Sequence, residues 1–142
     1  MKVYLDACVL NRLSDDRTQQ RIRKEAEAVE EIFRSIFLGE IEWSASVAVE
    51  LEVSRNPNLE KRQDALVLLT YAGPLVEATA EIAERAEELY RLGYGAADGL
   101  HLAFAEADHV DILLTTDDRF LRQAARGLGR PLVRVANPVN WK

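Results

Sequence analysis

Five short apolar segments alternate along the chain with longer segments of helical periodicity. The apolar segments run unbroken or alternate with polar residues at a period of two, which is typical of strands; they span residues 2–7, 40–45, 74–77, 110–115 and 131–136. The segments between them repeat apolar side chains every three or four residues, which predicts helices over 21–37, 79–93, 96–107 and 118–128. Strands separated by helices require crossover connections, so we expect an α/β fold whose parallel sheet is covered on both faces.

Length and composition narrow the class of protein. The length of 142 residues is typical of one domain, so we expect a single domain that spans residues 1–142. No apolar run is long enough to cross a membrane and no signal peptide follows the first residue, so we expect a cytoplasmic protein. Cys8 is the single cysteine, which excludes an internal disulfide and a cysteine-based zinc cluster. The net charge of −6 argues against a general nucleic-acid coat but is compatible with a nuclease whose site is itself acidic.

Three aspartates lie at strand ends or helix starts, where α/β proteins usually place their functional residues. Asp6 ends the first predicted strand, Asp117 follows the strand 110–115, and Asp98 opens a mostly apolar helix. Ligands of parallel sheets bind beyond the carboxyl ends of the strands, so these side chains converge if their strands are neighbours. Asp98 and Asp117 have a simpler interpretation as helix N-caps. Asp6 does not, because an ionised side chain beside a buried strand needs a partner.

A fourth acid comes from the helix after the second strand. Glu50 and Glu52 both lie at its start, two residues apart, so they point to different faces of the helix. At most one of them faces the predicted site, and the spacing alone does not choose between them.

The chemistry of clustered carboxylates points to a metal ion. Carboxylates held together repel one another and raise one another's pKa, a penalty that a divalent cation removes. Oxygen ligands favour Mg²⁺ or Mn²⁺ over zinc. Such an ion binds a phosphate oxygen and activates a water molecule for attack on phosphorus. The acids therefore indicate metal-assisted hydrolysis of a phosphodiester.

Three stretches in a fixed order contain the aspartates described above: 3–12, 97–105 with Asp-Gly-Leu-His-Leu-Ala, and 113–120 with Thr-Thr-Asp-Asp-Arg-Phe. Together they resemble the PIN-domain family, and VapC-type ribonuclease toxins within it. The first stretch resembles the family's first strand and first acid, the second its Asp-Ala-Leu-His-Leu-Ala signature at the third acid, and the last its Thr-x-Asp-x-x-Phe signature at the fourth acid. Residues 52–57 resemble a Glu-x-Ser-(Lys/Arg)-Asn-Pro stretch of one subgroup, so the resemblance favours Glu52 as the second acid.

Two positions depart from the family pattern. Gly99 stands where alanine is usual after the third acid. Cys8 stands where many members have serine, threonine or asparagine, so a water-holding hydroxyl is missing at this position.

The resemblance implies a three-layer α/β/α fold around a central, mostly parallel sheet of about five strands. It also implies a metal-dependent endoribonuclease that cleaves single-stranded RNA with Mg²⁺ or Mn²⁺. The acids that would hold the ion and carry the reaction are Asp6, Glu52, Asp98 and Asp117. Toxins of this type are usually neutralised by a small antitoxin and are often homodimers, so both partners are expectations for this chain.

The candidate substrate-binding residues are Arg12, Thr115 and Thr116. Arg12 lies in a cluster of cations after the first strand, and guanidinium groups suit bidentate contacts with phosphate. Thr115 and Thr116 are placed to orient a carboxylate or a water molecule. His101, three residues after Asp98, shares its helix face and is expected to have a structural role, either in the core or through a hydrogen bond.

Two other functions compete with the nuclease. One is a PIN-like binding module without catalysis, which the presence of all four acids does not favour. The other is a receiver-type signalling domain, which also gathers acids around Mg²⁺ at strand ends. That class needs a lysine at the end of the last strand, and residues 135–137 contain none.

Overall fold

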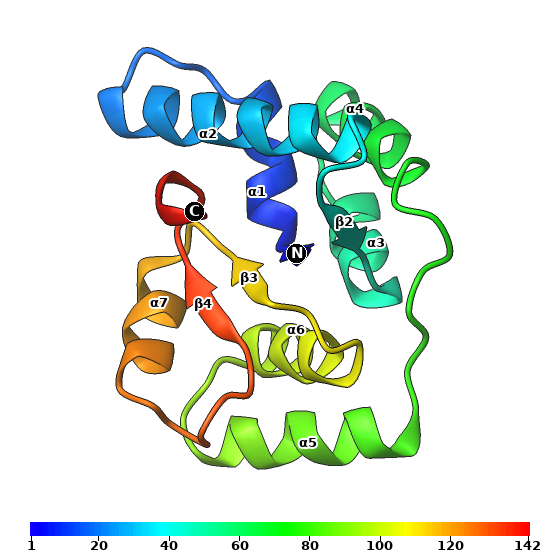
Figure 1. The fold of residues 1–142 in the computed structure, drawn as a ribbon, viewed down its shortest axis with the longest axis vertical. Helices are drawn as coiled ribbons and strands as arrows, with labels where there is room; N and C mark the ends of the chain where they lie inside the picture. The colour runs from blue at the N-terminus through cyan, green and yellow to red at the C-terminus, as the bar shows by residue number, and fades with distance from the viewer.

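The computed structural model describes residues 1–142 and contains one parallel sheet. Its four strands are β1 (Lys2–Leu5), β2 (Glu42–Ser44), β3 (Ile112–Leu114) and β4 (Arg134–Ala136). They are hydrogen-bonded in the order β2-β1-β3-β4, and every neighbouring pair is parallel. Val3 lies opposite both Trp43 and Ile112, so β1 is an inner strand. The predicted parallel α/β/α architecture is confirmed (Figure 1).

The expected fifth strand at residues 74–77 is wrong. This segment makes only an isolated bridge between Val76 and Ser46, with hydrogen bonds from Val47 to Val76 and from Val76 to Ala45. Pro74 has no backbone N–H, and Gly73 before it has a φ of 75° that turns the chain. The segment therefore cannot extend into a ladder, and the sheet has four strands rather than five.

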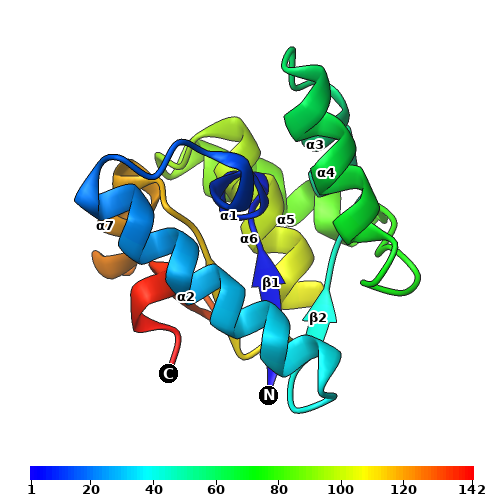
Figure 2. The same cartoon turned by 90° about the horizontal axis from the view of Figure 1, so that it is seen from above.

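Helices cover both faces of the sheet. They are α1 (Ala7–Asn11), α2 (Gln20–Phe37), α3 (Val47–Ser54), α4 (Leu59–Leu69), α5 (Ala80–Arg91), α6 (Ala96–Ala107) and α7 (Asp118–Ala125), with 3₁₀ turns η1 (Arg12–Ser14) and η2 (Pro138–Asn140). Figure 1 shows α2 on one side of the sheet and α6 on the other, with α5 outside α6. From above, α3 and α4 lie together at one end and α7 lies at the opposite end (Figure 2). No helix is both long and apolar enough to cross a membrane.

Helix α6 is extensively buried because it lies between the sheet and α5. Every residue from His101 to Glu106 on this helix is buried. A Cβ atom added to Gly99 would lie only 3.3 Å from the carbonyl oxygen of Ala86 and from Cβ of Leu89. The departure from alanine at position 99 therefore lets α5 approach α6 closely.

Candidate active site

The parallel sheet brings Asp6 and the segment after β3 to the same edge. Asp6 follows β1 directly, and its backbone N–H donates to the carbonyl of Leu114 over 3.0 Å. The residue is only 6% exposed, and its side chain accepts a hydrogen bond of 2.9 Å from the hydroxyl of Thr115. Asp6 thus has the partner that its position beside a buried strand requires.

Glu52 and His101 reach the same point from two different helices. Nε2 of His101 lies 2.7 Å from Oε1 of Glu52 and 3.6 Å from Oδ1 of Asp6. One ligand atom from each of these three side chains lies within 4.8 Å of the other two. Glu50 is exposed and makes no contact with this cluster. Of the two glutamates that the sequence offered, α3 therefore presents Glu52 to Asp6.

Sequence reasoning did not include His101 in the site. The spacing of three residues places His101 and Asp98 on one face of α6, and this spacing was the feature of the sequence that indicated a position near the acids. The other nitrogen, Nδ1, lies 2.7 Å from the hydroxyl of Tyr4, which lies 2.6 Å from the hydroxyl of Ser46. All three side chains are buried, so these polar groups depend on one another for hydrogen bonds.

Asp98 lies in the first turn of α6, half-buried and without a hydrogen-bond partner for its carboxylate. The N-cap of this helix is Gly95, which excludes the simpler interpretation of Asp98 as the N-cap. A Cβ atom on Gly95 would lie 3.3 Å from Oδ2 of Asp98, so glycine leaves this carboxylate room.

Asp117 does cap a helix. Its Oδ1 accepts hydrogen bonds from the backbone N–H groups of Arg119 (2.9 Å) and Phe120 (3.2 Å) at the start of α7. Its other oxygen, Oδ2, makes no hydrogen bond within the chain. Asp117 can therefore stabilise α7 and still offer an oxygen to a ligand.

The carboxylates perturb one another's titration. Burial, followed by the nearby charges of Asp117 and Asp6, raises the pKa of Asp98 to about 6. Burial also raises the pKa of Asp6, although the charge of His101 opposes this shift. Burial lowers the pKa of His101, but its hydrogen bond to Glu52 and the surrounding carboxylates outweigh burial and raise this pKa overall.

These residues fit a hard divalent cation. Asp6 and Glu52 offer carboxylate oxygens, while the third group of the cluster, Nε2 of His101, is already hydrogen-bonded to Glu52. The carboxylate of Asp98 accepts no hydrogen bond within the protein. A divalent cation would offset the repulsion that raises the pKa of Asp98. Oxygen ligands of this kind are those that Mg²⁺ and Mn²⁺ prefer.

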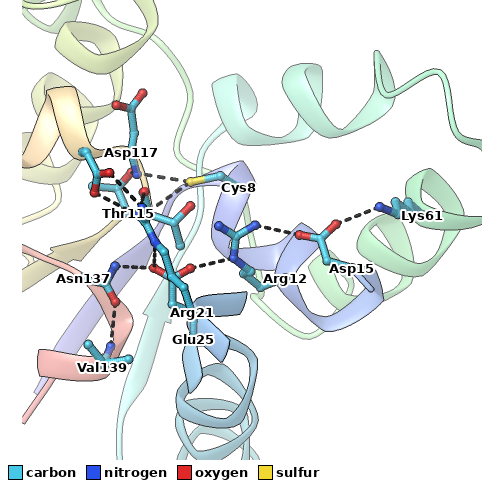
Figure 3. Close-up of polar contacts among 12 residues, drawn as sticks. Cys8, Arg12, Asp15, Arg21, Glu25, Lys61, Thr115, Asp117, Asn137 and Val139 are labelled. Atoms are coloured by element: carbon cyan, nitrogen blue, oxygen red, sulfur yellow. Dashed lines mark hydrogen bonds and ion pairs between the residues drawn. The ribbon is translucent and has the colours of Figure 1, made fainter. Parts of the chain in front are cut away.

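Of the three residues expected to contact substrate, Arg12 and Thr115 have side chains that are already engaged within the protein. Arg12 forms ion pairs of 2.8 Å with Asp15 and with Glu25 (Figure 3). Thr115 and Thr116 are buried, and the hydroxyl of Thr115 is occupied by Asp6. Contacts of these residues with substrate stay predictions.

Arg21, which sequence reasoning did not select, lies closer to the Asp117 segment. It donates to the carbonyl of Thr116 over 2.9 Å and to both carboxylate oxygens of Asp118. Arg21 belongs to the same cluster of cations after the first predicted strand as Arg12, but the sequence did not predict its contact with Thr116 and Asp118.

Cys8 packs against the same segment. Its sulfur lies 3.5 Å from the hydroxyl of Thr115 and accepts a hydrogen bond of 3.4 Å from the N–H of Thr116 (Figure 3). Burial raises the pKa of the Cys8 thiol to about 12, so the group is protonated at neutral pH. The thiol thus supports the segment between β3 and Asp117 as a neutral side chain.

Comparison with known proteins matches this arrangement to one family. The model of the PIN domain family matches residues 3–126. A similar fold occurs in VapBC2 from Rickettsia felis, which was solved bound to a DNA fragment from the VapBC2 promoter. The TM-score is 0.63 at 14% sequence identity, and the match covers 96% of this chain and 98% of that chain. FitAB bound to the IR36 DNA fragment gives a TM-score of 0.59 at 19% identity, covering 99% of this chain and 97% of that chain. No curated protein matches the sequence.

Proposed function

This chain belongs to the PIN domain family, and we propose that it is a metal-dependent endoribonuclease that hydrolyses single-stranded RNA. The observation that carries the proposal is the convergence of acids from separate elements on one edge of the sheet. One oxygen of Asp6 lies within 4.8 Å of an oxygen of Glu52 there, with His101 beside both, and the charges of Asp6 and Asp117 act on Asp98. We further propose that residues 1–142 form a single domain. Membership of this family removes the receiver-type alternative.

In the proposed reaction, Asp6, Asp98, Asp117 and Glu52 would hold Mg²⁺ or Mn²⁺, and Glu52 would also orient the attacking water. The bound ion supplies positive charge to a phosphate oxygen and lowers the pKa of water. Thr115 keeps Asp6 in place through its hydrogen bond of 2.9 Å. Asp117 is fixed by its bonds to the start of α7, and its free oxygen is available to the ion.

The biological setting is part of the proposal. VapBC2 and FitAB are structural neighbours of this chain, and both were solved with DNA fragments. We propose that this chain likewise is a cytoplasmic toxin bound and neutralised by a small antitoxin, and that it forms a homodimer. The neighbours' folds support this setting, while the substrate assignment rests on the acidic site.

The two glutamates of α3 offer a matched test of the site. Glu52→Gln is expected to lower the rate of RNA cleavage by about 100-fold or more, because it removes a carboxylate used in the reaction. Glu50→Gln changes the same charge two residues away on an exposed position and is expected to leave the rate unchanged. Equal rates for the two variants would contradict the assignment of Glu52.

A further inference from the structure

A buried chain of hydrogen bonds ends on Glu52. Ser46 and Tyr4 have no exposed surface and His101 is 1% exposed. The hydroxyl groups of Ser46 and Tyr4 lie 2.6 Å apart, and the Tyr4 hydroxyl lies 2.7 Å from Nδ1 of His101. The last link joins Nε2 of His101 to Oε1 of Glu52 over 2.7 Å. The function proposed above uses Glu52 and leaves the other three residues without a role.

The partners fix the direction of the last hydrogen bond. An ionised carboxylate only accepts hydrogen bonds, so Nε2 of His101 carries a proton and donates a hydrogen bond to Glu52. At the other nitrogen, the Tyr4 hydroxyl fixes the orientation of the ring. Ser46 in turn accepts a hydrogen bond from the N–H of Val49 and caps α3, the helix that carries Glu52. The chain therefore connects the start of α3 to a side chain on its second turn.

His101 is the one residue that holds the Glu52 carboxylate. The side chain of Glu52 is 36% exposed and makes no other hydrogen bond or ion pair within the protein. A glutamate with this exposure has several accessible rotamers, and ordering it costs conformational entropy. The rigid imidazole, buried between Tyr4 and the two acids, selects the rotamer that brings Glu52 beside Asp6.

We propose that His101 is a positioning residue, which donates Nε2–H to Glu52 and so holds that carboxylate in the orientation used for the divalent cation. This proposal rests on the proposed function in one respect, the use of Glu52 at the metal site. In this role His101 neither ligates the ion nor transfers a proton. Residues that orient metal ligands in this way typically change metal affinity by about 10- to 100-fold when they are removed.

The first test uses the metal-free protein and needs no substrate. Nitrogen-15 NMR of the imidazole ring at one fixed pH is expected to show a proton on Nε2 that exchanges slowly with solvent. Glu52→Gln should move this proton resonance upfield, because an amide oxygen is a weaker acceptor than a carboxylate, while Glu50→Gln should leave it in place. An unprotonated Nε2, or an Nε2 proton whose chemical shift is unchanged in Glu52→Gln, would overturn the proposal.

The second test is a double-mutant cycle on Mn²⁺ affinity, measured by calorimetry and electron paramagnetic resonance. His101→Leu and Glu52→Gln should each lower the Mn²⁺ affinity by about 10-fold. The double variant should have about the same Mn²⁺ affinity as the single variant with the lower affinity. Additive losses would show that His101 does not act through Glu52. Because His101→Leu risks misfolding, His101→Gln serves as the second variant: its amide retains a donor near Nε2 and should restore much of the affinity.

The outcomes separate this proposal from the proposed function. A direct nitrogen coupling to bound Mn²⁺ in the unaltered protein would make His101 a ligand and overturn the positioning role. Cleavage of RNA together with additive losses in the cycle would refute positioning and leave the nuclease intact. Coupled losses in a protein that cleaves no RNA would support positioning and refute the nuclease. Failure of the unaltered protein to bind Mn²⁺ would contradict both.

Discussion

At the scale of single residues, the site concentrates negative charge that the fold itself does not neutralise. Asp98 is the clearest case, because burial and the charges of Asp117 and Asp6 raise its pKa to about 6 from an ordinary value of 3.8. The folded protein therefore holds this proton more tightly than the unfolded chain does. Ionised Asp98 accordingly destabilises the metal-free fold, and this destabilisation is full above pH 6, shrinks as the pH falls from 6 to 3.8, and is absent below 3.8.

Asp98→Asn should therefore stabilise the metal-free protein in a pH-dependent way. After allowance for solvent screening of this half-buried group, the gain in the free energy of unfolding at pH 8 is about 1 kcal/mol. The gain should disappear as the pH approaches 4. Chemical denaturation in EDTA at both pH values measures it, and an equal effect at the two values would refute the explanation.

Sequence reasoning located the acids and one supporting residue, Thr115, whose hydroxyl holds the carboxylate of Asp6, but it did not predict the contact of His101 with Glu52. Asp6, Asp98 and Asp117 were found because each stands at a strand end or helix start, positions defined by local pattern. The contact of His101 with Glu52 joins residues 49 positions apart on two helices, and no local pattern encodes their approach. The engagement of Arg12 by Glu25 was hidden for the same reason.

At the scale of elements, the start of α7 combines a structural and a proposed catalytic role in Asp117. Its Oδ1 accepts two backbone N–H groups, and its Oδ2 is free. Both Asp117→Asn and Asp117→Ala remove the charge, but asparagine is as good an N-cap as aspartate and alanine is not. The two substitutions thus separate the cap from the chemistry.

Both variants are expected to lose RNA cleavage, whereas only Asp117→Ala should lose the cap, at a cost of about 1 kcal/mol in the free energy of unfolding. Parallel cleavage and denaturation measurements test this. Retained cleavage in Asp117→Asn would leave Asp117 with the capping role alone.

The accuracy of the predicted elements followed the strength of their patterns. Helix α6 spans Ala96–Ala107, the range that its apolar periodicity predicted. Helix α4 was not predicted, because its apolar residues are spread around the helix, with Leu59 and Val67 exposed. The segment 74–77 has a strand-like composition but lacks the backbone donor of Pro74.

At the scale of the whole molecule, a buried carboxylate ties distant parts of the chain together beneath the site. Glu25 of α2 is 2% exposed and accepts hydrogen bonds from Arg12 (2.8 Å), Arg21 (3.4 Å) and Asn137 (2.5 Å). These contacts connect η1, α2 and the segment after β4 (Figure 3). Through Arg21 the same network reaches Thr116, next to Asp117.

Glu25→Ala should lower the free energy of unfolding by about 3 kcal/mol, because it breaks the buried ion pair between Glu25 and Arg12. The guanidinium of Arg12 then keeps only its ion pair with Asp15. Glu27→Ala, an exposed glutamate on the same helix, is the control, and its effect should stay within about 0.5 kcal/mol. Urea denaturation measures both. Equal effects would show that the network contributes little to the fold.

The central claim is that the acids at the sheet edge hold a divalent cation and that the protein uses this cation to cleave RNA. Its most direct test is cleavage of a mixed pool of single-stranded RNA by the unaltered protein and by Asp6→Asn, each with Mg²⁺, with Mn²⁺ and with EDTA. We predict cleavage that requires the ion and is lost in Asp6→Asn, while circular dichroism shows that the variant is folded. Cleavage that persists in EDTA or in folded Asp6→Asn would contradict the claim.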